Sequence, residues 1–163
     1  MVRVNLVNPK DLTDEHLFAE RVELLMLQTF INKYPTGYIP SNYTLGKGHM
    51  SFFRDKTLFV KDRLNLVLDE IDDRINVEKK FELKFNYVSE YIPDSIDIEM
   101  NKARIIDRLL HPKKKTNHWH YYGQEILDIK EFISFHYNVG KLCTFCGKVL
   151  RDGDNENSCT ECE

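Results

Sequence analysis

Apolar residues that recur three and four positions apart constrain the fold of this chain more than any other feature of its sequence. Four stretches carry this spacing, at about residues 14–34, 60–75, 96–110 and 126–137. Residues so spaced fall on one face of an α-helix, which can bury that face against a neighbour. No alternating pattern lasts long enough to build a sheet. The sequence therefore predicts a mainly α-helical fold.

Polar residues and prolines mark where the predicted helices begin and end. Thr13 can cap the first helix, because a threonine oxygen accepts a hydrogen bond from a backbone N–H of the first turn. The Pro-Thr-Gly stretch at residues 35–37 can end that helix, and Pro112 follows the third. The stretch LGKGHMS, at residues 45–51, lacks the full glycine pattern of a nucleotide-binding loop. We interpret it as a turn into a helix that begins after Ser51.

All four cysteines lie near the end of the chain, in the stretch LCTFCGKVLRDGDNENSCTECE. Two CxxC pairs separated by twelve residues can place four thiolates around one zinc ion. Disulfides are the alternative, but they are unusual in a chain without a secretory signal. Four thiolates leave no open position for catalysis. We therefore expect a zinc ribbon over residues 139–163 with one structural zinc, bound by Cys143, Cys146, Cys159 and Cys162.

The charge of the chain is unevenly distributed. The net charge is −3 at pH 7, yet residues 100–125 hold six Lys/Arg against two Asp/Glu, with aromatic residues among them. A local patch of this kind is enough for a phosphate-binding surface, although a solvated basic helix face has the same pattern. No stretch approaches the roughly 18 apolar residues of a membrane span. We expect a soluble, cytoplasmic protein with no membrane partner.

Three ionisable residues line up on the first predicted helix. Spacings of four and three put His16, Glu20 and Glu23 on one stripe of its surface. This stripe is either an ordinary solvated face or a face that carries out acid–base chemistry.

Four segments of the chain resemble, in order, the pyrimidine-dimer DNA glycosylase family. They are MVRVNLVNPKDLTDEHLFAERVELL, LGKGHMSFFRDK, YIPDSIDIEMNKARI and HWHYYGQEI, which together span about residues 1–126. The resemblance implies a compact single domain, which we place at residues 1–138, with about three main helices and an N-terminal segment that reaches the active site. It also implies base excision and abasic-site lyase activity at one site.

The resemblance further implies which residues carry the chemistry. In the family the initiating methionine is removed and the α-amine of the next residue, here Val2, attacks the sugar C1′ to form an imine. An α-amine titrates near 7.7–8.0, so part of it is neutral at pH 7. Glu23 matches the essential carboxylate. Arg3 matches a phosphate contact and His16 a position near the sugar, while Glu20 is expected to be structural, for example by bonding Arg3. No cofactor is required for this reaction.

The basic and aromatic stretch also matches family positions that contact DNA. We expect the substrate to be double-stranded DNA with a lesion, a modified base or an abasic site, bound by a monomer. Packing is the alternative role for the aromatic residues. The expected DNA contacts are Arg3, Arg104, Arg108, Lys113, Lys114, Lys115, Trp119 and Tyr121.

The first helix departs from the family pattern at three positions. Val22 and Met26 stand where the dimer-specific enzyme has arginines, and Leu25 stands where it has a proline. The loss of two cations weakens the expectation that the excised base is a pyrimidine dimer, whereas the nucleophile and carboxylate positions are retained. A non-catalytic DNA-binding or protein-adaptor module on the same scaffold is the alternative function.

Overall fold

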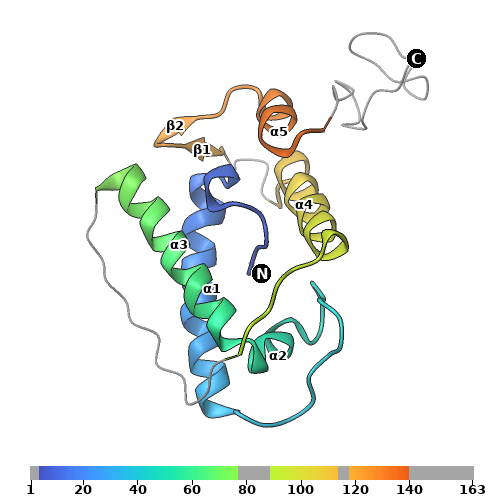
Figure 1. The fold of residues 1–163 in the computed structure, drawn as a ribbon. Helices are drawn as coiled ribbons and strands as arrows, with labels where there is room; N and C mark the ends of the chain where they lie inside the picture. The colour runs from blue at the N-terminus through green and yellow to red at the C-terminus, as the bar shows by residue number, and fades with distance from the viewer. Residues whose placement is uncertain (1–3, 77–88, 114–117, 140–163) are drawn as a thin grey trace, which may run out of the picture. The chain divides into compact units, whose positions relative to one another are not determined.

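The computed structural model describes residues 4–76, 89–113 and 118–139, which fold mainly into helices as the apolar spacing predicts (Figure 1). The chain divides into two compact units, residues 1–101 and 102–163. The predicted boundary after residue 138 stays a prediction. In the described residues the elements are the 3-10 turns η1 (Pro9–Asp11) and η2 (Phe53–Asp55), the helices α1 (Asp14–Lys33), α2 (His49–Phe52), α3 (Thr57–Ile75), α4 (Ser95–Leu110) and α5 (Ile129–Tyr137), and the strands β1 (His120–Tyr121) and β2 (Gln124–Glu125).

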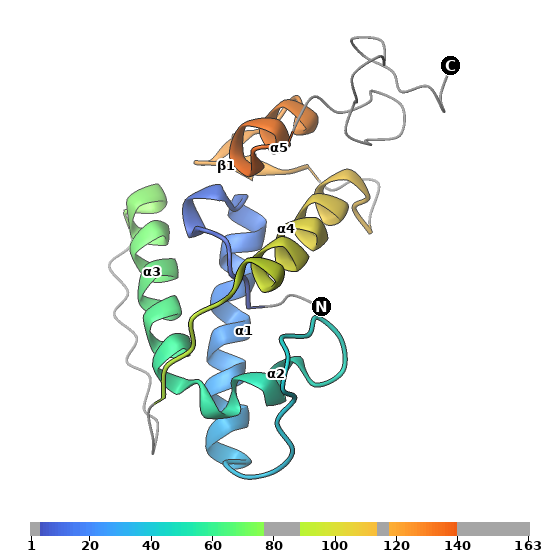
Figure 2. The ribbon, with the colours of Figure 1, turned by 45° about the vertical axis from the view of Figure 1, so that its right-hand side comes forward.

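Helices α1 and α3 lie side by side and form the core of the first unit (Figures 1 and 2). The buried apolar residues of α1 are Leu17, Leu24, Leu27 and Ile31. Those of α3 are Val60, Leu64, Val67 and Ile71. Each such side chain stabilises the fold by about 1.5–3 kcal/mol when fully buried. The spacing that predicts these two helices is therefore also the spacing of their contact.

The start of α1 is fixed by a cap and by the end of α3. Thr13 Oγ1 accepts a hydrogen bond from His16 N at 3.4 Å, which confirms the predicted cap. Arg74 donates to Asp14 Oδ1 at 2.8 Å and to Glu70 Oε1 at 2.8 Å. Burial by itself would lower the pKa of Arg74, but the bonds to Asp14 and Glu70 outweigh burial and raise the pKa. A charged guanidinium thus joins the two helices.

The short helix α2 begins earlier than predicted. It starts at His49 and not after Ser51, directly after Gly48. Gly48 has a φ of +97°, a backbone conformation that residues with a side chain rarely adopt. A Cβ atom at Gly48 would also lie 3.1 Å from Pro40 Cγ. The glycines of the LGKGHMS stretch therefore form the turn into α2. The helix begins about one helical turn before its predicted start.

A small hairpin in the second unit was not predicted. Strands β1 and β2 are antiparallel, and they pair His120 with Glu125 and Tyr121 with Gln124. The turn between them holds Tyr122 and Gly123, both with positive φ, as a tight two-residue turn requires. Strands of two residues are too short to show the alternation by which strands are predicted.

An ion pair lies buried between α1 and α3. Arg63 Nε is 2.7 Å from Glu20 Oε1, and the two side chains are 5% and 0% exposed. Arg63 Nη2 also donates to Glu20 Oε2 at 2.9 Å, so the pair is bidentate. Removing two charges from water is costly, and their attraction offsets that cost only while both partners are present.

Replacing Arg63 with leucine should lower the free energy of unfolding by about 3–5 kcal/mol, because the Glu20 carboxylate would stay buried without its countercharge. Urea denaturation followed by circular dichroism measures this change. Lys61→Leu is the matched control, since Lys61 is exposed on the same helix, and it should change stability by less than about 0.5 kcal/mol. Equal losses in the two variants would contradict the role given to the ion pair.

Candidate active site

The stripe of His16, Glu20 and Glu23 faces into the protein. Glu20 is 0% exposed and Glu23 is 7% exposed, while His16 is half-buried. A solvated helix face, one of the two alternatives for this stripe, is therefore excluded for both carboxylates. A buried carboxylate needs hydrogen-bond donors around it, because an unpaired charge is costly away from water. The donors around Glu20 show what it does.

Glu20 holds the N-terminal segment, residues 4–8, against α1 and α3. Its Oε1 accepts hydrogen bonds from Asn5 N at 2.8 Å and Arg63 Nε at 2.7 Å. Its Oε2 accepts from Asn5 Nδ2 and Arg63 Nη2, both at 2.9 Å. These donors occupy both carboxylate oxygens, so Glu20 serves the structure and not a substrate. The partner first suggested for it, Arg3, lies outside the described residues, as does Val2.

The following residues of the N-terminal segment are held by α3 and the first turns of α4. Asn101 Oδ1 accepts hydrogen bonds from Leu6 N at 2.8 Å and from Val7 N at 3.3 Å. Asn101 Nδ2 donates to Asn5 Oδ1 at 3.1 Å, and Arg63 Nη1 donates to Val7 O at 2.6 Å. The backbone of the segment is thus tied to side chains and has a fixed position relative to α1.

Glu23 and His16 flank the Glu20 anchor on the same face of α1. Glu23 lies one turn further along the helix and is nearly inaccessible to water. In such surroundings a charge acts more strongly on a neighbouring group than it does in water. His16 lies one turn before Glu20, and its Nδ1 is 3.0 Å from Thr13 Oγ1. The face therefore offers a shielded carboxylate and an oriented imidazole.

Val22 and Met26 lie on the exposed side of α1. Their side chains are 51% and 54% exposed, and Leu25 between them is half-buried. These are the positions at which the sequence departs from the arginines of the dimer-specific enzyme. The exposed surface of α1 is consequently apolar at these two positions, one of which adjoins Glu23 in the sequence.

The predicted basic contacts belong to the second unit. Arg104 and Arg108 are half-buried and lie one turn apart on α4, and Lys113 is exposed just after it. Lys114 and Lys115 lie outside the described residues. A role for these side chains on DNA phosphates stays a prediction.

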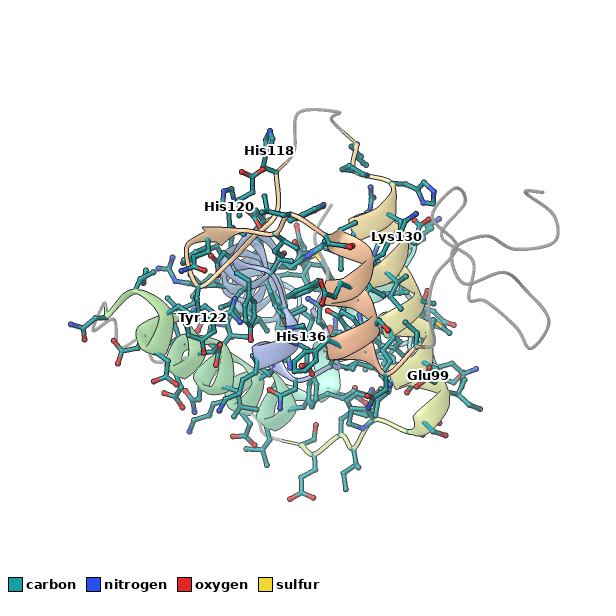
Figure 3. All side chains as sticks on the ribbon, turned by 90° about the horizontal axis from the view of Figure 1, so that it is seen from above. Glu99, His118, His120, Tyr122, Lys130 and His136 are labelled. Atoms are coloured by element: carbon teal, nitrogen blue, oxygen red, sulfur yellow. The ribbon has the colours of Figure 1, made fainter. Side chains whose placement is uncertain are left out.

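The aromatic stretch forms part of the packing of the second unit. The Tyr121 ring lies 5.3 Å from the Phe132 ring and 4.9 Å from the His136 ring, measured between centroids. Figure 3 shows His120 on the hairpin and His136 on α5. Trp119 is half-buried. Packing thus accounts for part of the Tyr121 surface, and a DNA contact by Trp119 or Tyr121 stays a prediction.

Sequence reasoning missed the residues that hold the N-terminal segment. Arg63 has a recognisable signal, since it falls between Val60 and Val67 on the apolar face of α3, where charged residues are rare. The other partners have no local pattern, because the bonds join residues as much as 96 positions apart. The missed residues are Asn5, Tyr43, His49, Arg63 and Asn101.

The described residues also bear on the predictions of metal and membrane sites. In the described ranges, no three His, Cys, Asp or Glu side chains come together in a way that could hold a metal ion. No helix in the part of the chain that the structure describes is long and apolar enough to cross a membrane. The predicted zinc ligands lie outside the described residues: Cys143, Cys146, Cys159 and Cys162.

Comparison with known protein families places the chain among the DNA glycosylases. Residues 1–83 match the family described as pyrimidine dimer DNA glycosylase. The match covers half of the chain, and the protein belongs to this family. The matched range includes the whole of α1 and α3, with Glu23, His16 and the Glu20–Arg63 pair. The basic residues of α4 lie beyond it.

Replacing Arg104 or Arg108 with glutamine should weaken binding to all duplexes alike, because phosphate contacts carry no sequence information. Each lost contact should reduce the steepness of log affinity against log salt by about 0.9. Fluorescence anisotropy at several salt concentrations measures both quantities. Lys61→Gln, which removes one charge from the exposed side of α3, is the control. An unchanged salt slope in both arginine variants would place the DNA elsewhere.

Proposed function

We propose that this protein excises a damaged or modified base, with the pyrimidine dimer as the first candidate, and then cleaves the strand at the resulting abasic site. In this proposal the Val2 α-amine, freed by removal of Met1, forms an imine with the sugar C1′. The observation that carries the proposal is the anchoring of the N-terminal segment: Asn5 is bonded to Glu20, one turn from the shielded Glu23.

The length of the chain allows the amine to reach this carboxylate. An extended chain advances at most about 3.6 Å per residue, so Val2 lies within about 11 Å of Asn5 along the chain. Three residues of α-helix advance about 4.5 Å, which separates Glu23 from Glu20. The chain is therefore long enough for the Val2 amine to reach Glu23, and this supports their use in one reaction.

The reaction has two stages that need the same carboxylate. In the first, a bond forms between the amine nitrogen and C1′, the bond from C1′ to the base breaks, and the base leaves with a proton. The sugar ring then opens at the bond between C1′ and O4′, O4′ takes up a proton, and the imine remains. In the second stage C2′ loses a proton and the 3′ phosphate leaves by β-elimination. Glu23 would stabilise the positive sugar and transfer protons in both stages.

Other residues would support this chemistry from the positions given above. His16, oriented by Thr13, would lie near the sugar, and Arg3 would bind a phosphate. Arg104 and Arg108 would hold the backbone, which helps to offset the few kcal/mol that extrusion of a base costs. A zinc ion bound by the four thiolates of residues 139–163 would stabilise that segment, since four sulfur ligands leave no position for a substrate.

Borohydride added during reaction with abasic duplex DNA should reduce the imine and join protein to DNA covalently, with the modified peptide beginning at Val2. The trapping rate should rise with pH up to about 8, because only the neutral amine attacks. Glu23→Gln removes the charge with little change in shape, and it should slow strand cleavage by about a hundredfold or more while leaving affinity for uncleavable DNA almost unchanged.

Mass spectrometry of the crosslinked peptide decides between the alternatives. Protein that retains Met1, or whose Val2 amine is acetylated, is the matched control and should give no crosslink at Val2, because in both the Val2 nitrogen is an amide. A crosslink on a lysine in protein with a free Val2 amine would contradict the N-terminal mechanism. A purified cellular protein that keeps Met1 and binds lesion DNA without cleavage would support the non-catalytic module.

Substrate choice should reflect the two apolar residues beside Glu23. Wild-type protein should cleave a preformed abasic site at least about tenfold faster than a cyclobutane pyrimidine dimer, because Val22 and Met26 supply no cations to the phosphates around a kinked lesion. The double variant with Val22→Arg and Met26→Arg should narrow this ratio. Gel assays of strand cleavage on the two duplexes measure it. Equally fast cleavage of both duplexes by the wild type would contradict this explanation.

A further inference from the structure

Val4 is held at both of its peptide groups by one short stretch of the chain. Its N–H donates a hydrogen bond to His49 Nε2 at 3.0 Å. Its carbonyl oxygen accepts one from the Tyr43 hydroxyl at 3.1 Å. We call these two side chains the Val4 clamp. Val4 is 1% exposed, so both bonds are made away from water, where a missing partner is costly.

The ring nitrogens of His49 have defined roles. Nδ1 lies 2.6 Å from the carbonyl oxygen of Thr44, which can only accept, so Nδ1 carries a hydrogen. The N–H of Val4 can only donate, so Nε2 must be the bare acceptor. His49 is therefore the neutral Nδ1–H tautomer, and its ring is aligned between Thr44 and Val4.

The clamp is embedded in aromatic packing. Tyr43 and His49 are each 3% exposed. The His49 ring lies 5.7 Å from the Tyr43 ring and 5.3 Å from the Phe53 ring, both edge to face. Tyr43 also meets the Phe52 ring edge to face at 5.7 Å. Buried side chains packed in this way have few alternative rotamers, so the clamp can fix Val4 in place.

The clamp has a different task from the other anchors of the N-terminal segment. Glu20, Arg63 and Asn101 fix residues 5–7, whereas the clamp fixes Val4, which among the described residues is the one nearest in sequence to the proposed nucleophile. Rotation about the backbone of Val4 would move everything before it. A reacting group misplaced by about 1 Å can slow a reaction by about a hundredfold. Bonds at both sides of Val4 remove that freedom.

We propose that His49 and Tyr43 are positioning residues for the Val2 amine, acting through Val4 and not by contact with DNA. This inference rests on the proposed imine mechanism. It assigns a role in the reaction to the stretch from the end of α1 to the first residue of α2, which contains none of the residues predicted to be catalytic. Loss of the clamp should slow the attack on C1′ and leave DNA affinity unchanged.

Two clamp variants and one rescue variant test the proposal. Tyr43→Phe removes only the hydroxyl, and His49→Leu removes the acceptor. His49→Gln places an amide oxygen at about the reach of Nε2 and should restore the bond. Tyr91→Phe is the matched control: its ring packs on the same Phe52 and Phe53 rings, but its hydroxyl donates to Asp97 Oδ2 at 2.6 Å and not to Val4. Burial and that bond raise the pKa of Tyr91, so it remains a donor.

The measured quantities are the single-turnover rate of borohydride trapping on saturating abasic duplex, and the Kd for a duplex with an uncleavable abasic analogue. Tyr43→Phe and His49→Leu should slow trapping by about tenfold to a hundredfold. Their Kd should stay within about twofold, and His49→Gln and Tyr91→Phe should trap at nearly the wild-type rate.

The outcomes separate this inference from the function on which it rests. Trapping by the wild type together with unchanged rates in Tyr43→Phe and His49→Leu would overturn the clamp alone. Equal slowing in Tyr91→Phe would also overturn it, since the effect would then follow from stability. A wild type that forms no crosslink would overturn the imine mechanism and the clamp together. If His49→Leu does not fold, Tyr43→Phe still decides.

Discussion

The buried contact between the Glu20 carboxylate and the Arg63 guanidinium is the interaction on which the rest of the structure depends. A carboxylate with no exposed surface must find donors for both oxygens, and Arg63 supplies only half of them. Asn5 supplies the others through its backbone and its side chain. The two main helices therefore cannot pack fully until the N-terminal segment has joined them. Completion of the core and placement of the N-terminal segment against α1 are therefore coupled.

Periodicity in the sequence predicts α1 and α3 well, because the contact between them repeats every turn and so leaves a repeating pattern. It cannot predict α2 or the β-hairpin, because four helical residues and two strands of two residues are too short for a pattern to repeat. The alignment of His16, Glu20 and Glu23 was visible from spacing, but their burial was not. Burial depends on Arg63 and Asn5, which meet Glu20 only in the folded chain. The spacing of apolar residues thus predicts the long helices, whereas the site is built from contacts between residues far apart in the sequence.

The range matched by the family holds most of the described contacts of the N-terminal segment. Residues 1–83 contain the carboxylate face of α1 and most of the network that holds the N-terminal segment. Apart from Arg3, the basic and aromatic residues proposed for DNA belong to the second unit. The surface of α1 that carries Val22 and Met26 differs from the pattern of the dimer-specific enzyme, although the face that carries Glu23 does not. In the proposed function, catalytic chemistry and lesion choice would therefore depend on different faces of one helix, one buried and one exposed.

The N-terminal segment is bound mainly through its backbone. Six backbone groups of Val4–Val7 bond to side chains of other elements, and none of them bonds in a strand or helix. Within the segment only Asn5 contributes its own side chain to these bonds. The residues at positions 4, 6 and 7 can therefore vary within the limits of size while the segment keeps these backbone bonds. Substitutions in the helices and loops around the segment have a larger effect, because each partner side chain there makes a specific hydrogen bond to the segment's backbone.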